Sequence, residues 1–312
     1  MKKISIVSSC YNEEDNLDEL YERVTAQMDK YKDKYEFEHI LLDNGSTDGT
    51  ANKLRELAQK DKRIKVIINS RNFGQLRAPF YGILQGYGDA VISIVSDLQD
   101  PPELISDLIE KWEEGNEIVL LQKQQSEEFG LMFLLRKIYY MTLAKIADNG
   151  VVLAQNCIGS GLYDQKAVAE MRKFDDPYPF IRGLICELGF NRAYVQFKQP
   201  VRTRGISCNN LYTLYDLGMT GVIKYSKLPL RIMAFVGFLM SILTFGLSIF
   251  YLVWKLVNWS NFSFGLAPII ISILFLGSVQ LFCLGILGEY IGAIYTRVDK
   301  KPLVIEKERI NF

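Results

Sequence analysis

Residues 90–103 read Ala-Val-Ile-Ser-Ile-Val-Ser-Asp-Leu-Gln-Asp-Pro-Pro-Glu, an apolar run that ends in a polar loop. The first six residues favour a strand, because apolar and β-branched side chains dominate them. The residues that follow carry the carboxylates of Asp97 and Asp100 and the amide of Gln99, directly after that strand in the sequence. A strand followed at once by such side chains is typical of the edge at which a parallel sheet binds its ligand.

An alternation of strand-like and helix-like segments surrounds this stretch and fills the first 125 residues. The expected strands are 4–7, 37–42, 64–68, 90–95 and 117–121, and the expected helices are 16–30, 50–59, 78–87 and 102–114. Strands that alternate with helices predict an α/β fold, with a mainly parallel sheet and helices on both of its faces.

Polar loops follow the first four predicted strands. They are residues 10–14, 43–50, 70–75 and 96–103. The carboxyl ends of parallel strands meet at one edge of a sheet, so we expect these loops to lie together. Carboxylate and amide oxygens are hard ligands, and the last loop is therefore suited to hold Mg²⁺ or Mn²⁺ against a diphosphate.

The overall charge and the cysteines exclude several classes of protein. There are 36 basic and 36 acidic residues, and a net charge of zero removes the general attraction to nucleic acid, so we expect no nucleic-acid partner. The 5 cysteines form no Cys-x-x-Cys pair, which disfavours a disulfide framework or a structural zinc site. We interpret them as reduced thiols in a cytosolic environment. The N-terminus lacks the apolar core of a signal peptide.

Two long segments near the C-terminus carry no charge. They are residues 232–254 and 256–288, the second of which contains the polar stretch 258–261. Each exceeds the roughly 20 apolar residues needed to cross a bilayer. We predict transmembrane helices at about 232–254 and 266–290, and the alternative is a pair of core helices in a soluble protein. This divides the chain into a domain at 1–227, two spanning helices within 228–295 and a tail at 296–312.

Basic residues lie outside this pair of helices. Lys224, Lys227 and Arg231 precede it and Arg297, Lys300 and Lys301 follow it, whereas the connecting loop has only Lys255 at its edge. Positive charge stays on the cytoplasmic side of a membrane. We therefore predict a multi-pass protein of the inner or plasma membrane, with both termini and the domain 1–227 in the cytoplasm and only about 258–265 outside.

Two other segments combine aromatic and basic side chains. Residues 129–147 and 211–224 are interpreted as amphipathic helices on the membrane surface. The alternative for each is a core helix of the domain 1–227.

Short motifs occur in a fixed order along nearly the whole chain. They are Tyr-Asn-Glu at 11–13, Asp-Asn-Gly-Ser-Thr-Asp-Gly-Thr at 43–50, Ser-Arg-Asn-Phe-Gly-Gln at 70–75, Gly-Asp at 88–89, Asp-Leu-Gln-Asp-Pro-Pro-Glu at 97–103, Phe-Ile-Arg-Gly at 180–183, Arg-x-x-Gly-x-Ser at 202–207, Ser-Lys-Leu-Pro-Leu-Arg at 226–231 and Gly-Glu-Tyr-Ile-Gly at 288–292. Together they resemble the inverting family 2 glycosyltransferases. More narrowly, they resemble the polyprenyl-phosphate group of that family, which acts on bactoprenol or dolichyl phosphate.

The resemblance implies a nucleotide-binding fold of the glycosyltransferase A type, anchored by two C-terminal helices. It implies transfer of one sugar, with inversion, from a nucleotide sugar to polyprenyl (undecaprenyl) phosphate at the cytoplasmic face of the membrane. The product would be a lipid-phosphate-linked sugar for glycosylation of the cell envelope. The implied partners are a nucleotide sugar, UDP-linked rather than GDP-linked, the polyprenyl phosphate and the lipid bilayer, and a homo-oligomer is left open.

The resemblance also implies roles for individual residues. Donor binding falls to Tyr11, Glu13, Asp43, Arg71 and Asp97, and the metal, Mg²⁺ or Mn²⁺, to Asp97 and Gln99. Acceptor phosphate falls to Arg202, Arg204, Ser207 and Arg136, and Asp97 and Arg202 are the candidate catalytic residues.

The chain departs from the family pattern at three places. Val95 stands where the pattern has its first acid, so either fewer protein ligands hold the metal or Asp100 and water compensate. Cys208 stands where a lysine is expected. Residues 122–125 read Gln-Lys-Gln-Gln where arginines are usual, so Lys123, Arg136 or Arg204 would supply the missing charge.

Transfer of a sugar to a lipid phosphate requires few catalytic groups from the protein. A lipid phosphate is already an anion and attacks the anomeric carbon without a strong base, so the enzyme has to position two reactants and neutralise the departing diphosphate.

Two other functions compete with single-sugar transfer. A processive polysaccharide synthase is disfavoured, because the chain has no Gln-x-x-Arg-Trp motif and two helices are too few for a channel. A catalytically impaired scaffold is motivated by Val95, Gln122, Gln125 and Cys208. The residues that argue against it are Asp43, Asp97, Gln99 and Arg202.

Overall fold

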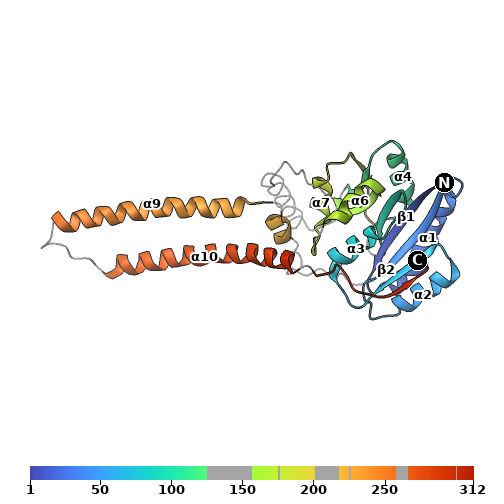
Figure 1. Ribbon diagram of the computed structural model, residues 1–312, viewed down its shortest axis with the longest axis horizontal. Coiled ribbons are helices and arrows are strands. Elements are labelled where there is room, and N and C mark those ends of the chain that lie inside the picture. The colour runs from blue at the N-terminus through green and yellow to red at the C-terminus, as the bar shows by residue number, and fades with distance from the viewer. Residues whose placement is uncertain (125–156, 175, 201–217, 225, 258–265, 300) are drawn as a thin grey trace.

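The computed structural model describes residues 1–124, 157–174, 176–200, 218–224, 226–257, 266–299 and 301–312. Figure 1 shows an α/β domain from which two long antiparallel helices extend as a hairpin. Both chain termini lie in the α/β domain, although the hairpin precedes the C-terminus in the sequence.

The element order agrees with the predicted alternation. The strands are β1 Lys2–Cys10, β2 Tyr35–Asp43, β3 Ile64–Asn69, β4 Ala90–Val95, β5 Ile118–Lys123, β6 Cys157–Asp164, β7 Arg192–Phe197 and β8 Glu306–Ile310. The helices are α1 Leu17–Lys30, α2 Thr50–Lys60, α3 Gly74–Leu84, α4 Ile105–Glu113, α6 Gln165–Lys173, α7 Ile181–Glu187, α9 Leu228–Val257 and α10 Leu266–Val298. Short 3-10 turns at Glu14–Asn16 and Pro102–Leu104 precede α1 and α4.

One sheet of 8 strands organises the domain, in the order β7-β5-β6-β4-β1-β2-β3-β8. The central strands β4, β1, β2 and β3 are parallel, and β5 is parallel to β7. Strands β6 and β8 run antiparallel to their neighbours. The predicted fold class, a mainly parallel sheet in an α/β domain, is confirmed.

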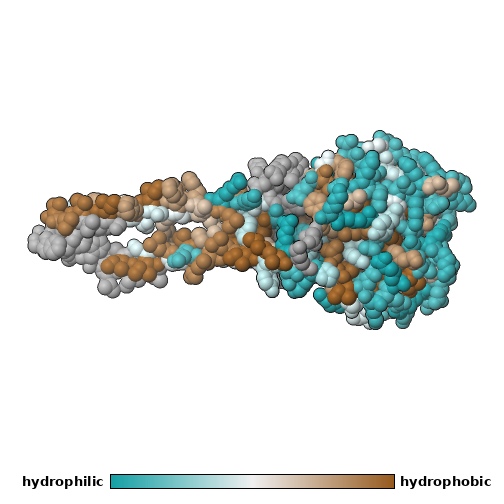
Figure 2. All heavy atoms as spheres, in the orientation of Figure 1, coloured by the Kyte–Doolittle hydropathy of each residue, from teal (hydrophilic) through white to brown (hydrophobic). Residues whose placement is uncertain are grey.

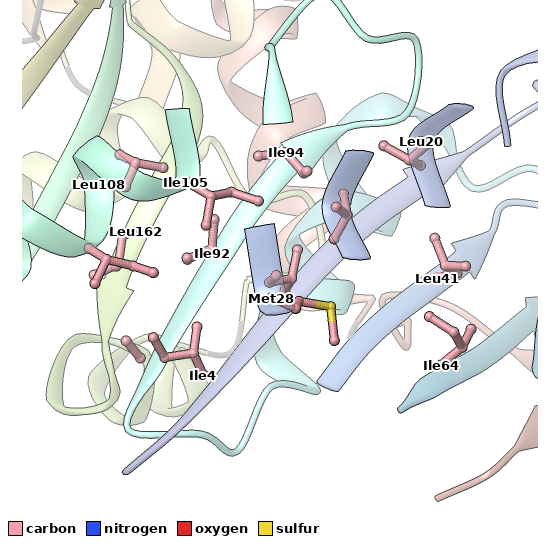
Figure 3. Close-up of a cluster of buried hydrophobic side chains, with 14 of the residues drawn as sticks. Ile4, Leu20, Met28, Leu41, Ile64, Ile92, Ile94, Ile105, Leu108 and Leu162 are labelled. Atoms are coloured by element: carbon pink, nitrogen blue, oxygen red, sulfur yellow. The ribbon is translucent and has the colours of Figure 1, made fainter. Parts of the chain in front are cut away.

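Alternating side chains of the central strands build a core on each face of the sheet. On one face, Ile4 and Leu41 pack with α1, α2 and α4 (Figure 3). On the other face, Val7 and Leu42 pack with α3, α6 and α7. Because helices cover both faces of the sheet, the central strands are apolar along most of their length. Their positions could therefore be predicted from the apolar runs in the sequence.

The C-terminal tail belongs to the sheet. Helix α10 continues to Val298, and residues after it return to the domain and form β8 along β3. Ile305 accepts a hydrogen bond from the Ser70 N–H at 2.9 Å, and Val304 is buried. Residues 296–312 were predicted only as a tail, because the charged stretch Glu306–Ile310 has no apolar alternation that would indicate a strand.

Helices α9 and α10 have 30 and 33 residues, and both contain a stretch long and apolar enough to cross a membrane. Within those stretches 0% and 6% of the residues are buried by protein. Figure 2 shows the resulting apolar surface along the hairpin, in contrast to the hydrophilic domain. The predicted surface helix 129–147 lies outside the described residues. Of the second, 211–224, only 218–224 are described, and they are helical.

Candidate active site

The loops that follow β1, β2, β3 and β4 lie at one edge of the sheet, because these strands are parallel and adjacent. This edge brings together the six predicted donor and metal residues that the structure describes. They are Tyr11, Glu13, Asp43, Arg71, Asp97 and Gln99. Strand β6 starts at the same edge, because its antiparallel pairing with β4 places Gly161 beside Ser93.

The first two loops are bound to each other. The Asn12 N–H donates to Ser46 Oγ at 2.9 Å, and the Thr47 N–H donates to Asn12 Oδ1 at 2.8 Å. Glu13 is buried, and its carboxylate accepts from Asn16 Nδ2 at 2.5 Å while its N–H donates to Thr50 Oγ1 at 3.0 Å. Glu13 therefore braces the loop that presents Tyr11.

Asp43 ends β2 with 1% of its surface exposed. Burial raises the pKa of its carboxyl group, and hydrogen bonds from Ser46 partly oppose that shift. The Ser46 N–H reaches Asp43 Oδ1 at 3.1 Å. Gly45 lies between Asp43 and Ser46 in the sequence and has φ +73°. Its backbone is so close to the third loop that an added Cβ would lie 2.3 Å from the carbonyl carbon of Arg71. Glycine is required there by both the backbone angle and the close approach.

Asn44 connects the second loop to the third. Its Oδ1 accepts from the Phe73 N–H at 3.0 Å, and its Nδ2 donates to Asn72 Oδ1 at 3.0 Å. Arg71 is exposed, and its guanidinium lies over the Phe73 ring with 4.1 Å between Cζ and the ring centroid. The third loop thus holds a cation at the edge of the sheet, where an anionic ligand can reach it.

The fourth loop contains the acids quoted at the start. Ser96 Oγ donates to the Ser9 carbonyl at 2.9 Å, which ties this loop to β1. Asp97 is partly exposed and accepts from the Gln99 N–H at 3.1 Å. Leu98 has φ +60°, a backbone conformation that is costly for a residue with a branched side chain. The chain reverses there, between Asp97 and the buried Asp100.

Asp100 is 0% exposed. Burial raises the pKa of Asp100 to about 6, and the negative charge of Asp97 adds to this shift. Hydrogen bonds from the Ser160 hydroxyl and the Val95 backbone, and the positive charge of Lys123, oppose this shift in part. The motif predicts Asp100 only as a residue that would compensate for Val95, because a motif does not reveal burial.

These acids do not form a closed metal cage. Within the described residues, no group of three or more His, Cys, Asp or Glu side chains is placed to hold a metal ion. Asp97 and Gln99 are hard oxygen donors on the partly exposed side of this loop, whereas Asp100 is buried beneath it. Such a site would need further oxygens from a bound ligand, as Mg²⁺ sites built on nucleotide phosphates do.

The predicted acceptor-phosphate residues cannot be placed against this edge. Arg136, Arg202, Arg204 and Ser207 all lie outside the described residues. Their roles stay predictions.

The structure adds a cleft of about 860 Å³ where the hairpin meets the domain. It is lined by α7, by the helical residues 218–224 and by the last part of α10. Lys224 pairs there with Asp176 at 2.6 Å, and burial lowers the pKa of that lysine although the ion pair opposes the shift. Burial raises the pKa of Glu187 in the same cleft, against the effect of Arg297. Three distant segments supply these residues, so no local motif could have indicated the cleft.

Comparison with known proteins identifies the fold and the hairpin separately. Residues 5–159 match the model of glycosyl transferase family 2, and residues 228–294 match the GtrB C-terminal hairpin. The uncharacterized glycosyltransferase sll0501 of Synechocystis sp. is 34% identical over 305 residues, which cover 97% of this chain and 94% of that protein. The chain belongs to glycosyl transferase family 2.

Other relatives of this glycosyltransferase are named by their acceptor. The bactoprenol glucosyl transferase of Shigella phage SfII is 33% identical over 312 residues, 98% of each chain. Among solved structures, glucosyl-3-phosphoglycerate synthase from Mycobacterium tuberculosis, in complex with Mn²⁺, UDP and phosphoglyceric acid, has a TM-score of 0.51 at 18% identity, covering 71% of this chain and 76% of the other. At this identity the likeness shows a shared fold and no more.

Proposed function

We propose that this glycosyltransferase moves one sugar from a nucleotide sugar to polyprenyl phosphate, with inversion at the anomeric carbon. The similarity to bactoprenol glucosyl transferases over 98% of both chains carries the proposal, because it spans the domain and the hairpin together. The product would be a lipid-phosphate-linked sugar for glycosylation of the cell envelope.

The donor would bind at the carboxyl edge of β1 to β4. Asp43 would hold the base or ribose, Tyr11 and Glu13 would line the nucleotide pocket, and Arg71 would face the phosphates. We assign a UDP-linked donor ahead of a GDP-linked one, and UDP is the nucleotide in the M. tuberculosis synthase of the same fold.

A divalent ion, Mg²⁺ or Mn²⁺, would sit between the donor diphosphate and the loop after β4, held by Asp97 and Gln99. When bound, it would neutralise charge on the departing diphosphate. The described residues supply too few ligands for an independent site, so we expect metal and donor to bind together.

The acceptor needs no strong general base, because its phosphate is already ionised near neutral pH. Cations near both phosphates matter more, since two anions have to approach each other. We assign this role to Arg202, with Arg204, Arg136 and Ser207 beside it. The cleft at the base of the hairpin is at the end of the domain that would face an acceptor arriving from the membrane.

We also propose that α9 and α10 cross the cell membrane, with the domain and both termini in the cytoplasm. The pairing of β8 with β3 supports this topology, because it holds the domain and the segment after α10 on the same side. An even number of crossings follows. The basic residues outside the hairpin favour the cytoplasm as that side.

The test is incubation of membranes containing the protein with labelled nucleotide sugars and undecaprenyl phosphate, followed by lipid extraction. One labelled sugar should appear on the lipid, and mild acid should release it. Absence of lipid-linked label with every donor would favour the scaffold function, and a polymer would favour a processive synthase.

Arg202→Ala tests the assignment of the acceptor phosphate. A charge-assisted hydrogen bond to phosphate in a dry site is worth several kcal/mol, so turnover should fall by roughly 10²-fold or more while donor affinity changes little. Arg202→Lys should recover only part of the rate, because a point charge does not reproduce the planar guanidinium. Arg204→Ala is measured in parallel as the rival assignment, and a larger loss in that variant would transfer the role to Arg204.

A further inference from the structure

Two arginines lie beside one aromatic ring, and no acid accompanies them. The guanidinium carbons of Arg71 and Arg77 are 4.1 Å and 5.9 Å from the centre of the Phe73 ring. Within the described part of the chain, neither arginine forms an ion pair with a carboxylate, and Arg71 is the charged neighbour that acts on Arg77. Other arginines of the domain contact a carboxylate oxygen at 2.6–2.8 Å, among them Arg23, Arg55, Arg63 and Arg309.

The hydrogen-bonding capacity of Arg77 is only partly used. Its Nη2 donates to the Pro302 carbonyl at 2.8 Å, whereas its Nε is buried and has no partner among the described residues. A guanidinium has several N–H donors and no acceptor, so the remaining donors require an acceptor from elsewhere. Burial and the charge of Arg71 both lower the pKa of Arg77, because each disfavours the charged form.

A structural role explains only one of these features. The bond from Arg77 to Pro302 attaches α3 to the segment after α10, and an uncharged amide would make the same bond. It does not explain two like charges at one ring, which repel each other. An anion bound beside them would remove that repulsion and supply acceptors for the remaining N–H groups.

The position of the two arginines indicates which anion reaches them. Arg71 belongs to the third loop at the carboxyl edge of the sheet, where we propose that the nucleotide sugar binds. Arg77 contacts the segment after α10, and Tyr178, which lines the cleft at the base of the hairpin, acts on it electrostatically. Both reactants of the proposed transfer carry phosphate, and the planar guanidinium group matches phosphate oxygens.

We propose that Arg71 and Arg77 together form a phosphate-binding site beside Phe73. The proposal rests on the proposed function for the two sources of that phosphate, the diphosphate of the nucleotide sugar and the phosphate of the polyprenyl lipid. Arg77 is then a binding residue that lies beyond the motif at 70–75, and the Pro302 carbonyl fixes its side chain.

The test measures phosphate binding without sugar transfer. Full-length protein in detergent, with Mg²⁺ present, is titrated separately with inorganic pyrophosphate, UDP and undecaprenyl phosphate. Arg77→Gln keeps an N–H donor for Pro302 but removes the charge. It should weaken pyrophosphate binding by roughly tenfold or more, the loss expected when a charge-assisted hydrogen bond to phosphate is removed. Unchanged pyrophosphate binding in folded Arg77→Gln would overturn the proposal.

The other two probes identify the source of the phosphate. A matching loss of UDP affinity assigns the site to the donor, and a matching loss of undecaprenyl phosphate affinity assigns it to the acceptor. A loss for pyrophosphate alone would keep the phosphate site and remove its connection to the transfer reaction. Failure of the lipid-product assay is therefore distinguishable from failure of this proposal.

Two further variants serve as comparisons. Arg309 also lies over an aromatic ring, 4.4 Å from the centre of Phe312, but it is paired with Glu306. Arg309→Ala is therefore the matched control, and it should bind all three probes as the unmodified protein does. Arg77→Lys keeps a positive charge without the planar guanidinium group, so it should recover part of the pyrophosphate affinity.

Thermal unfolding separates a binding residue from a structural one. Without ligand, Arg77→Gln should melt at the temperature of the unmodified protein or above it, because the repulsion from Arg71 is removed. It should also lose most of the stabilisation that pyrophosphate gives the unmodified protein. If Arg77→Gln does not fold, Arg71→Gln, at the exposed member of the pair, provides the same measurement. A lower ligand-free melting temperature with unchanged pyrophosphate affinity would overturn the proposal.

Discussion

The central strands of the sheet and the two helices of the hairpin are both rich in apolar side chains, but among the described residues only those of the strands are covered by protein. In the sheet, Ile4 and Leu41 are 0% and 1% exposed, whereas Phe245 of α9 and Leu281 of α10 are 68% and 71% exposed. Side chains of the strands point alternately to the two faces of the sheet, and helices cover both faces. Among the described residues, no such layer of helices covers the hairpin. The same side-chain types are therefore stabilised by packing in one region and need an outside apolar medium in the other.

The two regions also differ in charge, and the difference separates their roles. The charged groups of the candidate site gather at the carboxyl edge of the sheet, while residues 232–254 contain no Asp, Glu, Lys, Arg or His. Chemistry and anchorage are thus assigned to different parts of the chain. The return of the chain through β8 joins them, because both ends of the hairpin attach to the same domain.

Removing the hairpin should produce the largest effect. Replacing residues 228–298 with a flexible Gly-Ser linker keeps β8 in the chain but ends confinement to the surface that holds the acceptor. Confinement raises effective concentration, so the yield of lipid-linked sugar should fall by roughly 10²-fold or more. The measurement is product after lipid extraction, with UDP affinity as the control, which should be unchanged. Normal yield from the hairpin-free variant would contradict the separation of roles.

Matched truncations should show the difference in packing directly. Leu41→Ala removes a fully covered side chain and should cost about 2–5 kcal/mol of unfolding free energy. Leu281→Ala should cost less than about 1 kcal/mol in detergent, because no protein cavity is created there. Denaturant unfolding of both variants in the same detergent provides the comparison. Equal losses would indicate that the hairpin packs against protein.

Acid should weaken the sheet domain through Glu38. Burial alone would raise the pKa of this carboxyl group, but hydrogen bonds from Lys3, Lys65 and Ser5 outweigh burial and hold the pKa below its usual value. A lowered folded pKa means that the stabilisation is complete above the unfolded value of 4.5 and is lost as pH falls through and below it. Melting temperature measured from pH 7 to pH 3 should therefore fall less steeply for Glu38→Gln than for the unmodified protein. Parallel curves would show that other carboxylates control acid unfolding.

The sequence predicted most of the fold for reasons that the burial pattern explains. Strands such as Ala90–Val95 are covered on both faces and read as apolar runs, and the helices on them show one apolar stripe. Strand β8 was missed because its side chains, such as Lys307 and Arg309, are polar and its place depends on pairing with β3. Edge strands are commonly charged, which hides them from hydrophobic patterns.

The candidate site was predicted in part for a similar reason. Loops that follow parallel strands must meet at one edge, so motif order alone placed Asp43, Arg71 and Asp97 together. Motifs do not reveal burial, and only the structure shows that Asp100 is buried. The cleft beside Lys224 is formed by three segments that are far apart in the chain. No sequence motif predicts that these segments contact one another.

The smallest effect is expected where β8 is held to α2 by charge. Arg55 donates to Glu308 with 2.7 Å between Nη2 and Oε2, and both side chains are about one third exposed, at 34% and 36%. Exposed ion pairs are worth about 0–1 kcal/mol, so Arg55→Ala, Glu308→Ala and the double variant should give a coupling energy in that range. It should shrink in 1 M salt, where charges are screened within about 3 Å. Most of the attachment of β8 would then come from its backbone pairing with β3 and from the buried Val304. A coupling above about 2 kcal/mol would show instead that charge carries the attachment between the tail and the sheet.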